Sequence, residues 1–160
     1  MKKLSGKNAF ISGSSRGIGL ACAKAIAEQG ANVFLVATNE VLLKEVTSAI
    51  QQRSAVQVGF HAVDLRTLEG CQQASHAFLE RFGQADILVN SAGATKGGIF
   101  PEQSDEEMID GFALKFHGAV RLCRQLWPSL KQSNGTVINI VGGAARSPSG
   151  DFMVGGSVNA

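Results

Sequence analysis

Tyrosine is absent from the 160-residue sequence, which also contains only one tryptophan, three prolines and three cysteines. Without tyrosine, no reaction of these residues can use a phenol as its proton donor or base. The cysteines, Cys22, Cys71 and Cys123, each fall on a face of a predicted helix. We interpret them as reduced packing residues of a cytoplasmic protein, because no activating neighbour is evident for a catalytic thiol.

Long apolar runs and a strong excess of one charge are also missing. The apolar runs reach only strand length, so we expect no membrane-spanning segment. Lys2 and Lys3 are not followed by the apolar stretch of a secretory signal. The net charge of +2 gives no reason to expect a nucleic-acid partner. His61 and His76 lack the spacing of metal ligands, so no metal is assigned.

A glycine-rich turn over residues 13–19, with the sequence GSSRGIG, organises the N-terminal part of the chain. An apolar run precedes it and a helical pattern follows it, which is the opening unit of a dinucleotide-binding sheet. Gly13 would turn the chain sharply, Gly17 would let the backbone approach a ligand, and Gly19 would let the helix pack closely on the strand. The alternative is a tight turn that binds no ligand.

Apolar runs of strand length alternate with helical patterns along the rest of the chain. Strands are expected at 8–12, 32–37, 55–63, 86–90 and 136–141, and helices at 17–29, around 42–50, at 68–82 and from about 105 to 132. Ser104 and Glu107 form a capping box before the long last helix, and Pro128 is expected to kink its last turn. This alternation predicts a single α/β domain over residues 1–160, built on a doubly wound parallel sheet with five strands present.

Two further motifs join the glycine turn. Residues 90–93, Asn-Ser-Ala-Gly, follow the fourth strand, and Asp64 ends the third. Together with the turn they resemble the short-chain dehydrogenase/reductase family, including its 3-oxoacyl reductases. The resemblance implies a Rossmann-type fold and a nicotinamide cofactor held by Gly13, Ser15, Arg16, Gly17, Ile18, Gly19, Thr38, Asp64, Leu65, Asn90, Ala92 and Gly93. Alternatively, Asp64 is a turn or capping residue, and Asn90 satisfies only local backbone groups.

The end of the second strand bears on the choice of cofactor. It reads Ala37-Thr38-Asn39, without the acidic side chain that would hold the ribose 2′-OH of NAD and repel a 2′-phosphate. Arg16 lies within the glycine turn, where family members that prefer NADP often carry a basic residue. We therefore expect NADP(H) rather than NAD(H), although Arg16 could instead be a solvated surface residue.

The resemblance also locates the places of the family's catalytic serine, tyrosine, lysine and asparagine. In this sequence they are Gly142, Gly155, Asn159 and Lys115, so none of the four residues is present. We expect standard carbonyl or alcohol hydride transfer to be absent or very weak. Lys115 is either a polar helix residue without a role or a cation that replaces the missing lysine.

The family continues beyond the region matched by residue 160, with a further helix, two strands and a substrate loop. We therefore expect a C-terminally incomplete domain whose missing strands leave the fifth strand as an open edge, and a homo-oligomer formed through the long helix. The substrate is a small molecule that the sequence does not identify. Two functions stay open, an atypical NADP(H)-linked oxidoreductase and a catalytically inactive nucleotide-binding or regulatory subunit.

Overall fold

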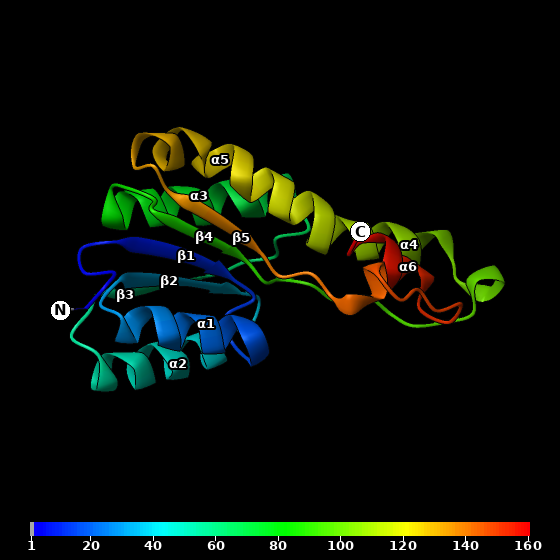
Figure 1. The fold of residues 1–160 in the computed structure, drawn as a ribbon, viewed down its shortest axis with the longest axis horizontal. Coiled ribbons are helices and arrows are strands. Elements are labelled where there is room, and N and C mark those ends of the chain that lie inside the picture. Colours follow the sequence, from blue (N-terminus) through cyan, green and yellow to red (C-terminus); the bar gives the residue numbers. More distant parts are fainter. Residues whose placement is uncertain (1) are drawn as a thin grey trace.

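The computed structural model describes residues 2–160, in which five parallel strands form one sheet in the order β3-β2-β1-β4-β5 (Figure 1). The strands are β1 Asn8–Ser12, β2 Asn32–Ala37, β3 Val58–Ala62, β4 Ile87–Asn90 and β5 Thr136–Asn139. The chain runs from β1 outward to β3, then crosses to β4 on the other side of β1. The reversal between β1 and β4 opens a crevice at the carboxyl ends of these strands. The predicted doubly wound parallel sheet is confirmed.

Helices cover both faces of the sheet. Figure 1 shows α1 and α2 on one face and α3 and α5 on the other, while α4 and α6 lie beyond the carboxyl ends of the strands. The elements outside the sheet are α1 Gly17–Glu28, α2 Glu40–Arg53, α3 Leu68–Phe82, η1 Phe100–Glu102, α4 Asp105–Phe112, η2 Ala113–Gly118, α5 Ala119–Gln132, η3 Gly143–Ala145 and α6 Met153–Ser157. Within residues 2–160, no helix combines the length and apolarity that a bilayer crossing requires.

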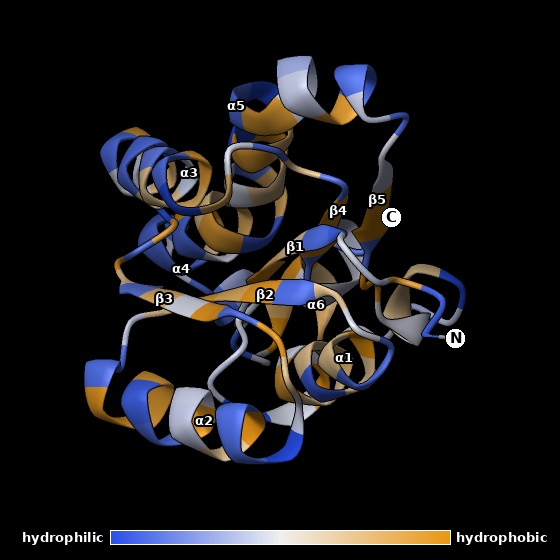
Figure 2. Cartoon of the chain, turned by 90° about the vertical axis from the view of Figure 1, so that its left-hand side faces the viewer, coloured by the Kyte–Doolittle hydropathy of each residue, from blue (hydrophilic) through white to orange (hydrophobic). Residues whose placement is uncertain are grey.

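The alternating side chains of each strand supply two cores, one on either face of the sheet. Phe10 of β1 packs with Phe34 and Phe78 between the sheet and α3, where ring centroids lie 5.5–5.9 Å apart. Ile11, the next residue, belongs to the opposite core with residues of α1 and α2. Figure 2 shows much of the sheet, and the helix surfaces that face it, in the orange of apolar residues. Burial on both faces accounts for the continuous apolar runs of the central strands.

The three cysteines are free thiols within or beside these cores. Cys71 is buried in α3, and burial raises the pKa of its thiol to about 11. A thiol with so high a pKa is a poor nucleophile, because the thiolate is the reactive form. The interpretation of Cys71 as a packing residue therefore agrees with its surroundings.

Several predicted boundaries differ from the structure. β3 begins at Val58 rather than at residue 55, because α2 extends to Arg53 and the following residues turn back toward the sheet. β5 ends at Asn139 rather than at 141. The capping box is half formed: the Glu107 N–H donates to Ser104 Oγ over 3.3 Å, but the Glu107 carboxylate accepts from Lys96 instead.

The largest difference is in the long last helix, which is three segments in the structure. α4 leads into η2, a π-helical stretch over Ala113–Gly118, and α5 continues from it through Pro128 to Gln132. A π-helical turn adds a residue to the turn and rotates the side chains that follow, without breaking the helix. The spacing of apolar residues stays close to that of an α-helix across the π-helical segment. The sequence pattern therefore does not reveal the π-helical segment.

Asp86 joins the amino ends of three strands. Its carboxylate accepts from Lys7 Nζ over 2.8 Å, from the Asn8 N–H over 2.9 Å and from Gln84 over 3.1 Å, and its carbonyl accepts from the Thr136 N–H over 2.8 Å. Burial by itself raises the pKa of this carboxyl. The hydrogen bonds from Lys7, Asn8 and Gln84 outweigh burial, so the pKa of Asp86 lies below its usual value.

We expect Asp86→Asn to lower the free energy of unfolding at pH 7 by about 1–3 kcal/mol, because charge-assisted hydrogen bonds to a buried carboxylate are lost. A carboxyl with a depressed folded-state pKa stabilises the fold above its unfolded pKa of about 4, and this contribution disappears as the pH falls through the folded value. Urea denaturation at pH 7 and pH 3 measures the difference, with the exposed Glu28→Gln as control. A deficit that is equally large at both pH values would contradict the assignment.

Candidate functional site

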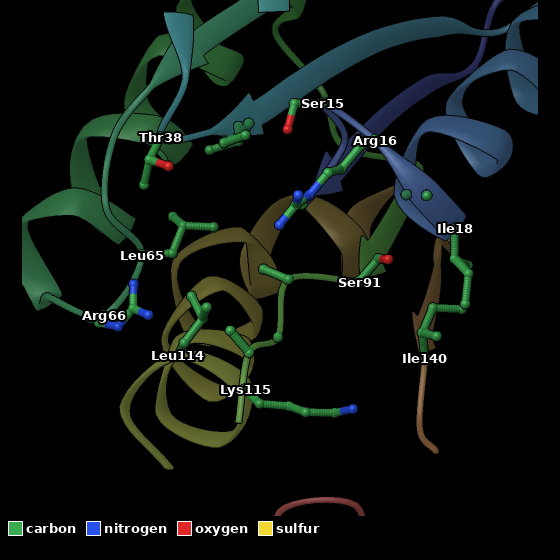
Figure 3. Close-up of a pocket in the computed structure, with 18 of the residues that line it drawn as sticks. Ser15, Arg16, Ile18, Thr38, Leu65, Arg66, Ser91, Leu114, Lys115 and Ile140 are labelled. Carbon is green, nitrogen blue, oxygen red and sulfur yellow. The ribbon is translucent and has the colours of Figure 1, made fainter. Parts of the chain in front are cut away.

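A cleft of about 520 Å³ opens at the carboxyl ends of the central strands, where the strand order reverses between β1 and β4 (Figure 3). Its walls come from the glycine turn, the ends of β2 and β3, the segment after β4, the π-helical segment η2 and the end of β5. Of the predicted cofactor residues, the cleft is lined by Gly13, Ser15, Arg16, Gly17, Ile18, Gly19, Thr38, Asp64, Leu65, Ala92 and Gly93. Residues far apart in the sequence therefore meet at one place, as an α/β crevice requires.

The three glycines of the turn have different surroundings. A Cβ atom on Gly13 would lie 2.8 Å from the backbone of Ala92, and a Cβ atom on Gly19 would collide with the Gly13 carbonyl oxygen. Gly17 has a φ of +58° and nothing within 4 Å of the corresponding position. Gly13 and Gly19 are thus required by packing, whereas the open backbone at Gly17 is left for a ligand to approach.

Two buried serines fix the turn, and the sequence pattern did not single them out. Ser12 Oγ accepts from the N–H groups of Ser91 and Ala92 over 3.0 and 3.1 Å, which ties β1 to the segment after β4. Ser14 Oγ accepts from the Val36 N–H over 2.8 Å, which ties the turn to β2. The groups that these hydroxyls bind are distant in sequence, so no local pattern predicts the contacts. Only the small size of the two serines is consistent with buried positions in a tight turn.

At the β2–β3 end of the cleft, polar side chains are partly engaged with one another. Asp64 Oδ1 accepts from the Arg66 N–H over 2.9 Å and lies 3.3 Å from Arg66 Nη1. One oxygen of this carboxylate therefore stabilises the local turn, which was the alternative to a cofactor role for Asp64. Arg66 also pairs with Asp110 over 2.6 Å, and this hydrogen bond raises the pKa of the arginine. Leu65 is buried in the core and also lines the cleft.

The end of β2 carries no acidic side chain, as the sequence shows, and Asn39 there is used to cap α2 by accepting from the Leu42 N–H over 3.0 Å. Thr38 is exposed at the cleft wall. Figure 3 shows the Arg16 side chain extending from the glycine turn into the cleft. Its guanidinium has no ion pair with any residue in 2–160.

Asn90 lies outside the cleft and lines a neighbouring hollow between β5 and α5. Its side-chain amide donates to Asn139 Oδ1 over 2.8 Å across the β4–β5 pair, in which these two residues are directly in register. Asn90 therefore braces the β4–β5 pair through a cross-strand side-chain contact, which is neither the predicted cofactor role nor the local backbone role given as its alternative. Ala92 and Gly93, two and three residues later, line the cleft.

Lys115 enters the cleft from the π-helical segment. Its aliphatic chain passes over Gly93, where an added Cβ atom would lie 3.1 Å from Lys115 Cδ. Figure 3 shows the side chain extended from η2 beside Leu114, on the side of the cleft where Ile140 lies. Burial lowers the pKa of the Lys115 ammonium group. His117, two residues later, lines a separate surface hollow and takes no part in the cleft.

The places of the three other expected catalytic residues are joined to one another. The Asn159 side chain accepts from the Gly142 N–H, and its amide donates to the Gly155 carbonyl over 2.6 Å. The Phe152 ring occupies the space in which a side chain at Gly155 would begin. The 142–159 cluster, defined by Gly142, Phe152, Gly155 and Asn159, is therefore a packed arrangement of backbone, amide and aromatic ring that contains no ionisable side chain.

Comparisons with known proteins agree with this geometry. Residues 7–155 match the sequence model of the family described as short chain dehydrogenase. A fatty acyl-CoA reductase of Acinetobacter baylyi is 37% identical over 142 residues, which cover 87% of this chain and 48% of that protein. The chain spans about half the length of the curated relatives it matches.

Two solved structures show the same fold with a nicotinamide cofactor bound. The L-sorbose reductase of Gluconobacter frateurii, complexed with NADPH and L-sorbose, has a TM-score of 0.95 and 34% identity over 99% of this chain and 60% of that chain. A xylitol dehydrogenase bound to NAD⁺ has a TM-score of 0.92 over 99% of this chain and 61% of that chain. Its identity of 21% supports the fold alone.

The packing of Phe152 leads to a stability prediction. Gly155→Ala should destabilise the chain by about 1–3 kcal/mol, because the added methyl group must displace the ring. Gly156→Ala is the matched control: it lies next in α6, and its Cβ atom would make only an ordinary 3.5 Å contact with the Ala144 carbonyl. Urea denaturation of both variants is the measurement. Equal effects of the two substitutions would mean that Phe152 does not fill the Gly155 position.

Proposed function

The chain belongs to the short-chain dehydrogenase family, and we propose that its cleft binds NADP(H) in support of an atypical oxidoreductase activity. One observation carries the proposal. The glycine turn is packed tightly at Gly13 and Gly19 but open at Gly17, next to the amino end of α1. This combination fits a pyrophosphate, which needs close access to backbone N–H groups and benefits from the positive end of a helix dipole.

The preference for NADP(H) over NAD(H) is supported by one side chain at the end of β2 and one within the glycine turn. Thr38 stands where an acidic residue would hold the 2′-OH of NAD and repel a 2′-phosphate. Arg16 reaches into the same cleft without a carboxylate partner among residues 2–160. A guanidinium with free donors suits a phosphate dianion. The NADPH complex of the L-sorbose reductase favours the same choice, while the NAD⁺-bound xylitol dehydrogenase has the fold without sharing enough sequence to weigh on it.

The bound cofactor would supply or accept a hydride, and the chain would have to position the substrate and move a proton. The 142–159 cluster is poorly suited to moving a proton, because the two glycines and the amide side chain of Asn159 offer no acid or base near neutral pH. Standard tyrosine-dependent turnover is accordingly not part of the proposal. The second candidate function, a nucleotide-binding or regulatory subunit without turnover, is favoured by the same cluster.

Self-association is a further part of the proposal. Phe116 and Trp127, on the segment from η2 through α5, have about half of their surface exposed, at 49% and 54%. Val120 lies between them and is 39% exposed. Apolar side chains gathered on one helical surface are typical of a protein interface. A second copy of the chain is the partner we propose, together with a small-molecule substrate and a cytoplasmic location.

Gly17→Val should abolish NADPH binding, because a branched side chain would occupy the backbone surface that the pyrophosphate approaches. Gly83→Val is the matched control, since Gly83 has a similarly positive φ of +74° and open surroundings away from the cleft. Arg16→Ala should weaken NADPH by about 1–3 kcal/mol and NADH little. Calorimetric titration measures all three. No saturable binding of NADPH to the unmodified chain at millimolar ligand would refute the proposed function.

NADPH-dependent reduction of ketones and 3-oxoacyl thioesters should be absent or very weak. A positioned proton donor contributes about 10²–10⁴-fold to such a rate, and the 142–159 cluster provides none. Weak hydride transfer could survive from proximity alone. The measurement is NADPH oxidation across a panel of carbonyl compounds, with Gly17→Val as the control that lacks cofactor. Rapid turnover that disappears in Gly17→Val would show that a residue outside the 142–159 cluster donates the proton.

A further inference from the structure

The strand order divides the cleft into two halves. Thr38, Asp64 and Arg66 come from the carboxyl ends of β2 and β3 on one side of β1. Residues 91–94 and 140–142 come from the ends of β4 and β5 on the other side, together with Lys115 from η2. In dinucleotide-binding sheets the pyrophosphate lies at the first turn and the adenosine ribose at the end of the second strand. The β4–β5 side is therefore the nicotinamide half of the cleft.

Charge is distributed unequally between the halves. The charged residues that line the cleft, within the described chain, are Arg16, Asp64, Arg66 and Lys115. The single carboxylate, Asp64, lies at the adenosine end and is engaged by Arg66. The nicotinamide half contains Lys115, and the hollow beside it adds Arg124 and no carboxylate. This half of the cleft is thus cationic and has no acidic side chain to offset it.

The Lys115 side chain is held in this half by its surroundings. η2 directs it into the cleft, Gly93 leaves the space in which its aliphatic chain lies, and no carboxylate among residues 2–160 forms an ion pair with it. Burial lowers the pKa of this amine, and the side chain is half-buried at the cleft wall.

We propose that Lys115 makes this cleft bind NADPH more tightly than NADP⁺. The nicotinamide ring carries a positive charge when oxidised and none when reduced, so the ammonium group opposes only the oxidised form. Like charges a few ångströms apart near a protein surface can change a dissociation constant roughly tenfold after screening. The proposal rests on the proposed binding of NADP(H) and adds a preference for one redox state of the cofactor.

The experiment is calorimetric titration of the chain with NADPH, NADP⁺ and adenosine 2′,5′-bisphosphate, which lacks the nicotinamide half. The unmodified chain should bind NADPH about tenfold more tightly than NADP⁺. Lys115→Met and Lys115→Gln should each bring the two affinities close together, mainly by tightening NADP⁺. Lys115→Arg should keep the preference. Adenosine 2′,5′-bisphosphate should bind all Lys115 variants with the same affinity as the unmodified chain. In the surface control Lys131→Met, the affinities of all three nucleotides should match those of the unmodified chain.

The outcomes separate the two proposals. If adenosine 2′,5′-bisphosphate and NADPH bind but NADPH has no advantage over NADP⁺, or if the advantage survives in a folded Lys115→Met or Lys115→Gln variant, the role of Lys115 is wrong while cofactor binding stands. If none of the three nucleotides binds the unmodified chain, the proposed function fails and the role of Lys115 fails with it. Urea denaturation establishes that each variant is folded, and the two neutral substitutions test the charge independently.

Discussion

The close approach of two backbone segments, the turn at Gly13 and the residues at Ser91 and Ala92, is the contact on which the site depends. A side chain at Gly13 would collide with Ala92, and Ser12 Oγ holds both amides of the second segment. The contact joins β1 to the segment after β4 at the point where the strand order reverses. These hydrogen bonds hold the two segments against each other at the wall of the crevice between their strands.

The two ends of the crevice then differ in how their polar groups are used. At the β2–β3 end, Asp64, Arg66 and Asp110 are committed to one another. At the β4–β5 end, Lys115 is the charged side chain that lines the cleft, and apolar residues such as Leu114 and Ile140 lie around it. In the proposed function, the pyrophosphate of the cofactor would lie at the glycine turn between these regions, with the adenosine part toward the first region and the nicotinamide ring toward the second. The second region offers little acid–base chemistry.

The 142–159 cluster is a packed structure at the positions where the family resemblance predicts three of the catalytic residues. Asn159 satisfies the Gly142 N–H and the Gly155 carbonyl, and the Phe152 ring fills the space above Gly155. Any side chain at position 155 would therefore require Phe152 to move first. The identities of these residues were evident from the sequence through the family resemblance, but their mutual contacts were not.

Local patterns in the sequence determined the elements and the turn. Apolar runs of strand length located the strands, apolar residues spaced three and four apart located the helices, and the spacing of Gly13, Gly17 and Gly19 located the crevice. The absence of tyrosine by itself excluded phenol chemistry from these residues. The tertiary structure alone decided the π-helical segment that directs Lys115, the packing of Ser12 against Ala92, the pairing of Arg66 with Asp110, and the burial of Phe152 against Gly155. Hydrophobic periodicity is a local property of the sequence, whereas most of these contacts join residues tens of positions apart. The course of a helix through a π-helical turn also depends on the residues that pack around it.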